Sequence, residues 1–224
     1  YQVQIRTHYP ETRALEIQVM EQERKCMDHS ARQPYVPGFM RDIVAEVTLQ
    51  ARQSPDVNQT SGVSVRASIS SLETLIAASE RRALRLEEEE AVPRISDLNA
   101  LAASVTGKLE FEYAGNDQPE EEIVEKLVRR AVKIVFDERF RLEDLEPVVQ
   151  AFQEGWKVEV GDQLLSLEYL EGLDQIEGLR DAIRQLSEES TPARTASAVE
   201  FILEGLHLSN RLNKEVEGHK VLYR

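Results

Sequence analysis

Arg66 stands at the junction between a glycine-containing turn and a strongly patterned helix, in the stretch SGVSVRAS that begins at Ser61. Gly62 gives the backbone freedom to turn, and the hydroxyls of Ser61 and Ser64 can cap a helix. The free amides and the positive dipole at a helix start attract anions, and a guanidinium beside them can hold two phosphate oxygens. The residues alone leave two interpretations open, an anion-binding arginine and an ordinary surface charge.

A second candidate is the stretch KIVFDE, residues 133–138, in which an apolar run ends in Asp-Glu. Nucleotide hydrolases hold magnesium with such acidic residues at the end of a strand. The apolar residues around the stretch recur, however, at the spacing of one helical face: Ile123, Leu127, Ala131, Ile134 and Val135. We therefore expect the end of a helix here. The chain has no G-x-x-x-x-G-K-[ST] phosphate loop, and its single Gly-Lys pair, Gly107-Lys108, lacks the first glycine.

The remaining reactive groups show no spacing typical of a metal or nucleophile site. The histidines are His8, His29, His207 and His219, and Cys26 is the single cysteine. Neither a zinc cluster nor a disulfide within one chain is therefore expected. The arginines Arg81, Arg82 and Arg85 are expected to flank the polar face of their helix and to pair with nearby glutamates. A nucleotide role for these arginines is the second interpretation.

The net charge of −14 is unevenly distributed along the 224 residues. Residues 1–107 carry 12 basic and 15 acidic side chains, whereas residues 108–224 carry 15 basic and 26 acidic side chains. An acidic surface repels phosphate backbones, so nucleic-acid binding by the second half is not expected. No apolar run approaches the roughly 18 residues that span a bilayer, and no signal-peptide pattern opens the chain. We expect a cytoplasmic protein that binds neither nucleic acid nor membrane.

The first half is predicted to be a short strand followed by a helical bundle. The strand covers residues 1–10, and the four helices cover about 12–27, 39–51, the apolar stripe from Ile69 to Leu86, and 96–104. The acidic run Glu87–Glu90 is expected to be solvated, and Pro93 stops the third helix.

The second half is predicted to be mostly helical with a few short strands. The strands are expected in GKLEFEY (107–113), WKVEV (156–160) and HKVLYR (219–224). Helices are expected from a capping box at Asp117 and Glu120 to about Phe136, at 142–154, as a pair at 166–186, and from Thr191-Pro192 to about Leu212. The fold class is therefore mainly α, with Gly107 as the boundary between two helical regions.

Two of these stretches, SGVSVRASISSLETLIAASERRALR and PRISDLNALAASVTGKLEFEY, resemble the helical lid of AAA+ ATPases of the magnesium chelatase subunit I and MoxR group. The opening QIRTHYPETRALEIQVMEQE is similar to the segment that joins the ATPase core of that group to its lid. The later ASAVEFILEGLHLSNRLNK resembles a C-terminal extension of bacterial chelatase-like members. The resemblance covers nearly the whole chain and is specific over residues 1–113.

This resemblance implies three parts: the last strand of the ATPase core (1–10), the lid bundle (11–107) and a mostly helical C-terminal extension (108–224). Arg66 takes the position of the sensor-2 arginine, which contacts the γ-phosphate of ATP bound by a neighbouring subunit. The phosphate loop, the magnesium-binding acids, sensor 1 and the arginine finger would all precede Tyr1. ATP and Mg²⁺ are therefore expected in the full-length protein, and this portion alone should be inactive.

The resemblance also implies self-association into a ring, expected to be a hexamer, and a client or adaptor protein with a metal-ion-dependent adhesion fold. The ring would remodel that partner or assist metal insertion. An autonomous helical protein-interaction domain without a nucleotide function is the alternative. A transcription activator of the enhancer-dependent type is a third hypothesis, which the acidic charge and the lack of a helix-turn-helix pattern disfavour.

Overall fold

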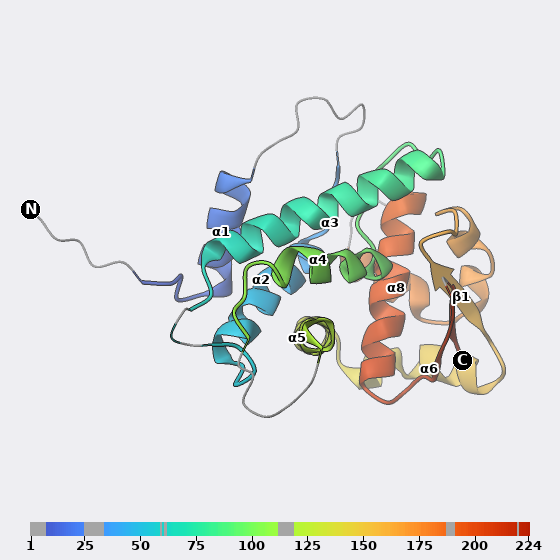
Figure 1. Cartoon of the computed structure of the whole chain (residues 1–224). Coiled ribbons are helices and arrows are strands. Elements are labelled where there is room, and N and C mark those ends of the chain that lie inside the picture. Colours follow the sequence, from blue (N-terminus) through green and yellow to red (C-terminus); the bar gives the residue numbers. More distant parts are fainter. Residues whose placement is uncertain are drawn as a thin grey trace, which may run out of the picture.

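The computed structural model describes residues 8–24, 34–58, 60, 62–111, 119–186, 191–218 and 220–224, which are mainly helical with one small antiparallel sheet (Figure 1). This architecture confirms the predicted fold class. The α-helices are α1 (Arg13–Glu23), α2 (Gly38–Gln53), α3 (Val65–Arg85), α4 (Leu101–Val105), α5 (Glu120–Arg139), α6 (Glu146–Gln153), α7 (Leu179–Leu186) and α8 (Pro192–Leu208). The 3-10 helices are η1 (Ile95–Ala100), η2 (Leu142–Leu145), η3 (Glu168–Leu170) and η4 (Leu173–Gln175), and the strands are β1 (Val158–Gly161), β2 (Lys214–Glu217) and β3 (Lys220–Tyr223).

The core forms where α2, α5 and α8 pack together. Phe39 of α2 stacks on Phe201 of α8 at 4.5 Å between ring centroids, and Phe136 of α5 meets Phe201 edge-on at 5.9 Å. Gly205 makes this approach possible, because a Cβ there would lie 2.0 Å from Cδ2 of Phe136. One cluster of buried apolar side chains continues from Met20 to Tyr223, so helices on both sides of Gly107 share it. The division at 107 stays a prediction.

The sheet has the strand order β1-β3-β2, and both pairs are antiparallel. In this register Val160, Val221 and Val216 lie in one row across the three strands. Exposure increases along the row, from 3% at Val160 to 65% at Val216. The strands predicted at 156–160 and 219–224 are confirmed, whereas β2 was not predicted.

The strand predicted over 107–113 is wrong in its described part. Of residues 107–111, only Phe111 pairs, in an isolated bridge with Val57. The alternation of Leu109 and Phe111 instead reflects burial, since both side chains enter the hydrophobic core. The strand predicted at 1–10 falls mostly on residues outside the described ones, and 8–10 are not in a strand.

The helices agree with the sequence prediction best where the apolar stripe is long. Thr191 caps α8 by accepting from the Arg194 N–H at 3.3 Å with Pro192 in the first turn, as predicted, and Asn210 at a φ of 59° lies just beyond its end. The capping box predicted for α5 is wrong, because the N-cap is Pro119 without a side-chain cap; Asp117 lies outside the described residues. The predicted helix pair at 166–186 is η3, η4 and α7.

Candidate functional site

Arg66 lies in the first turn of α3, and its side chain is exposed. Ser64 is the N-cap, and its Oγ accepts from the Arg66 N–H at 3.3 Å. Gly62 has a φ of 71°, so the chain turns there through a conformation that favours glycine. Within the described ranges the structure records no ion pair for the Arg66 guanidinium. The group is therefore exposed to solvent, which agrees with both interpretations of the sequence, an anion-binding arginine and an ordinary surface charge.

A buried ion pair fixes the turn that presents Arg66. Glu16 of α1 is fully buried, and its carboxylate receives Arg52 Nη1 at 2.9 Å and Nη2 at 3.1 Å. Ser68 donates to the same carboxylate at 2.6 Å, and Arg52 Nε donates to the Val63 carbonyl at 3.0 Å. This fork-to-carboxylate geometry joins α1 and α2 to the start of α3. The start of α3 is thus connected to both α1 and α2 by these hydrogen bonds.

The turn also packs closely against Tyr9. A Cβ on Gly62 would lie 2.0 Å from the Tyr9 hydroxyl oxygen, so only glycine fits this place without rearrangement. The Arg52 guanidinium lies 4.5 Å from the centroid of the Tyr9 ring, which is a cation–π distance. The sequence analysis did not identify Tyr9, Glu16 or Arg52, because their contacts join segments far apart in the chain.

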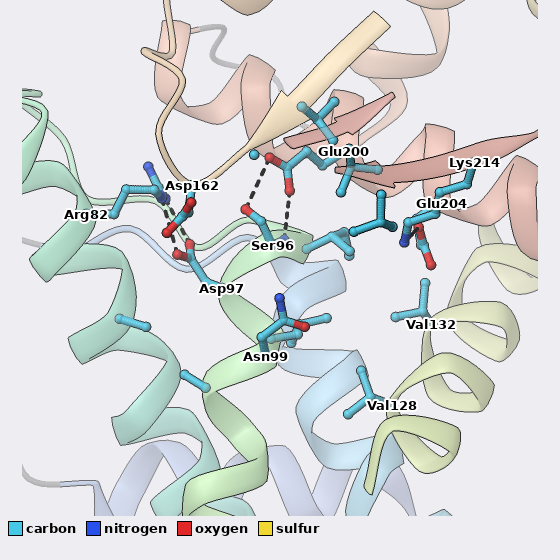
Figure 2. A pocket seen from close by; sticks show the side chains of 18 of the residues that line it. Arg82, Ser96, Asp97, Asn99, Val128, Val132, Asp162, Glu200, Glu204 and Lys214 are labelled. Carbon is cyan, nitrogen blue, oxygen red and sulfur yellow. Dashed lines mark hydrogen bonds and ion pairs between the residues drawn. The ribbon is translucent and has the colours of Figure 1, made fainter. Parts of the chain in front are cut away.

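A cleft of about 700 Å³ opens at the other end of α3 (Figure 2). Its walls come from α3, η1, α5, α8 and the sheet, and Val128 and Val132 face it from α5. This volume falls in the range of small-molecule and peptide sites, roughly 300–1,000 Å³. Buried charges line it, and Figure 2 shows Arg82 joined to Asp97 and Ser96 joined to Glu200.

Arg82 belongs to this buried network and not to the polar face of α3, so its predicted position is corrected, whereas the expected pairing with a nearby glutamate is found at Glu88. The side chain is 2% exposed; Nη2 lies 2.9 Å from Asp97 Oδ2 and Nη1 3.1 Å from Glu88 Oε2. Burial opposes the charge, but Asp97 and the nearby glutamates outweigh it and raise the pKa of Arg82. Arg81 and Arg85 are exposed, as predicted.

The acidic run after α3 is likewise not solvated throughout. The Glu88 side chain is only 8% exposed, and its carboxylate also forms an ion pair with Arg94 Nη2 at 2.9 Å. Its Oε1 further accepts the Ser166 N–H at 2.6 Å, which joins the end of α3 to the segment after β1. Glu90 pairs with Arg194 of α8 at 2.7 Å. The run therefore ties the first half of the chain to the second.

Two carboxylates on α8, those of Glu200 and Glu204, also line the cleft. Glu200 accepts from the Ser96 N–H at 2.8 Å and from the Tyr169 hydroxyl at 2.5 Å. Glu204 accepts from Lys214 Nζ at 2.7 Å and from the Tyr223 hydroxyl. Burial, and then the charge of Glu200, raises the pKa of Tyr169 above its ordinary value; burial and Glu204 do the same for the pKa of Tyr223.

The raised pKa values of Tyr169 and Tyr223 predict a loss of stability at alkaline pH. Above about pH 10 the unfolded chain releases these protons and the folded chain keeps them, so unfolding gains up to about 1.4 kcal/mol per pH unit for each tyrosine. Their contribution is thus complete below about pH 10 and lost as the pH rises further. Urea unfolding at a series of pH values measures the slope. The same slope in the Tyr169→Phe/Tyr223→Phe variant would contradict this explanation.

The other candidates carry no assembled site. KIVFDE is the end of α5, as predicted: Val135 and Phe136 are buried, and Asp137 pairs with Lys133. His207 Nδ1 lies 3.0 Å from the Leu212 carbonyl, His8 is exposed, and Cys26, His29 and His219 lie outside the described residues. In the part of the chain that the structure describes, no group of three or more His, Cys, Asp or Glu side chains could hold a metal ion.

Comparison of the chain with protein-family models, curated proteins and solved structures found no match. Of the helices described, none combines the length and apolar character needed to cross a membrane.

Proposed function

We propose that this chain is the lid and C-terminal extension of a magnesium chelatase-like AAA+ ATPase, which couples ATP hydrolysis in a ring to remodelling of a partner protein or to metal insertion. In this proposal Arg66 contacts the γ-phosphate of ATP held by a neighbouring subunit of a hexamer. ATP supplies the phosphoryl group and Mg²⁺ shields its charge, both bound by residues outside this chain. The arginine and the first-turn amides of α3 fit an anionic phosphate.

The observation that carries the proposal is the exposure of Arg66 in the first turn of α3. A guanidinium buried against a carboxylate could not reach another subunit, whereas this one has no recorded ion pair among the described residues. The Glu16–Arg52 pair beneath it holds the entrance in one position, which a phosphate contact across an interface requires. Loss of the γ-phosphate would then release α3 and shift the lid.

The cleft favours a second candidate, an autonomous helical protein-interaction domain without a nucleotide function. Its volume of about 700 Å³ and its mixed apolar and charged walls suit a peptide segment. This candidate needs no ATP, so the two functions differ in what must accompany the chain.

The reading frame that encodes this chain separates the two candidates. The ATPase proposal expects a G-x-x-x-x-G-K-[ST] loop roughly two hundred residues before Tyr1 and ATP hydrolysis by the complete polypeptide. A polypeptide that lacks this loop and does not hydrolyse ATP would contradict the proposal and leave the interaction domain. The measurement is steady-state phosphate release by the purified complete protein, with and without Mg²⁺.

A further inference from the structure

The two edges of the sheet differ in whether their outward backbone groups are satisfied. Asn213 and Arg224 exchange both backbone hydrogen bonds, at 2.8 and 3.0 Å, and they continue the β2–β3 pair. Antiparallel ladders alternate between hydrogen-bonded and non-hydrogen-bonded pairs. Lys214 and Val216 therefore point their N–H and C=O groups away from β3. No hydrogen bond to these four groups is recorded among the described residues.

The opposite edge is partly covered. By the same alternation Glu159 and Gly161 of β1 point their backbone groups away from β3. At Gly161 both groups have partners within the chain: its N–H donates to the Tyr169 hydroxyl at 2.9 Å, and its carbonyl accepts from the Leu164 N–H at 3.4 Å. The β1 edge is thus covered by its own chain at Gly161, whereas neither outward residue of β2 has a recorded backbone partner in the described part of the chain.

The β2 edge also borders the cleft. Lys214 and Val216 share the sheet face that lines it, together with Val221 and Tyr223 of β3. Val216 is 65% exposed although its row partners are buried or half-buried. Val128 and Val132 of α5 also line the cleft, and Figure 2 shows them below Glu204 and Lys214. A strand added beside β2 would place every second side chain between these apolar walls.

We infer that the β2 edge binds an extended segment of a partner protein, in which apolar residues alternate with basic ones. The segment adds a fourth strand: its backbone pairs with Lys214 and Val216, and its apolar side chains enter the cleft beside Val216. This mode of recognition takes affinity from main-chain hydrogen bonds and specificity from alternate side chains. The inference concerns the described chain alone and does not depend on an ATPase.

Charge selects a basic segment. The outer face of β2 carries Glu215, which pairs with Arg224, and Glu217, which is exposed and has no ion pair recorded within the described part of the chain. Opposite charges on neighbouring strands stabilise a pair by about 0.2–1 kcal/mol. Residues 108–224 carry 15 basic and 26 acidic side chains, so the surroundings also attract cations. A second copy of this chain, with its own charge of −14, is disfavoured by the same field.

The test uses a fluorescent, end-capped peptide of alternating lysine and valine, with binding to the chain followed by fluorescence anisotropy. Val216→Pro removes the outward N–H without breaking a bond to β3, and we expect it to weaken binding about tenfold or more. Glu159→Pro makes the same change on the β1 edge, where it should alter the affinity less than about twofold. Hydrogen exchange of the Lys214 and Val216 amides should slow when the peptide binds.

An N-methylated peptide of the same sequence keeps its charge but cannot pair with an edge, so it should bind about tenfold more weakly to the unaltered chain. This comparison holds even if Val216→Pro fails to fold. Equal affinity of the two peptides, or of the wild-type chain and a folded Val216→Pro variant, would overturn strand addition. Preference for an alternating glutamate–valine peptide would overturn the charge argument. A wild-type chain that forms dimers, together with a monomeric Val216→Pro variant, would assign the edge to a second copy of this chain instead.

Discussion

Replacing Arg66 by alanine in the complete protein is expected to lower the rate of ATP hydrolysis by about 10³-fold or more, which is the lower range for an arginine that stabilises a transferred phosphoryl group. In the proposed function the guanidinium would meet charge that develops on the γ-phosphate, where it is more effective than in water. The fold should survive, because the side chain is exposed and without a recorded ion pair in the described residues. Phosphate release at saturating ATP measures the effect.

Two matched variants accompany Arg66→Ala. Arg66→Lys keeps the charge but loses the two-pronged donor geometry, so it should recover only part of the rate. Arg141→Ala removes another exposed arginine, at the N-cap of η2, and should leave hydrolysis unchanged. Wild-type turnover by Arg66→Ala, with an unaltered circular dichroism spectrum, would remove Arg66 from the mechanism.

Replacing Arg82 by methionine is expected to lower the free energy of unfolding by about 3–5 kcal/mol, the usual cost of breaking a buried ion pair. The change leaves Asp97 and Glu88 with buried charge and fewer donors, at 4% and 8% side-chain exposure. It also weakens the connection between α3 and the segment that contains Ser166. Urea unfolding followed by circular dichroism gives the free energy.

The control for Arg82→Met lies one helical turn further along α3. Arg85 pairs with Asp162 at 3.3 Å, but both side chains are well exposed. Its loss should therefore cost less than about 1 kcal/mol. If Arg82→Met destabilises no more than Arg85→Met, the buried network does not hold the two halves of the chain together. Adding Asp97→Leu to Arg82→Met should recover only part of the stability, because it removes a buried charge but also removes the acceptor of the Arg94 N–H at 2.8 Å.

The sequence predicted helices where local periodicity dominates. The caps of α3 and α8 and the burial of α2 follow from residues within a turn or two of each other, so their patterns are readable. The mistakes share one physical cause: the alternation of apolar residues and the charge of a segment do not show which distant residues will contact it. Leu109 and Phe111 alternate because they are buried, and no strand pairs along them.

The candidate site was predicted only in its local part. Arg66 could be identified because glycine, serine and arginine stand next to each other at a helix start. Arg82 resembles Arg81 and Arg85 in the sequence, and only the packing of Asp97 and Glu88 around it sets it apart. The cleft depends on contacts such as that between Ser96 and Glu200, which are 104 residues apart. No local pattern encodes such a contact.

The most direct test of the central claim is ATP hydrolysis by mixed rings. One subunit type carries Arg66→Ala, and the other carries a disabled phosphate loop but keeps Arg66. If Arg66 acts on the nucleotide of a neighbour, equal mixing should restore about one quarter of the wild-type rate, because head-to-tail contacts then pair an intact loop with an intact arginine. A mixture that stays as inactive as either variant alone would contradict the claim that this arginine acts across a subunit interface.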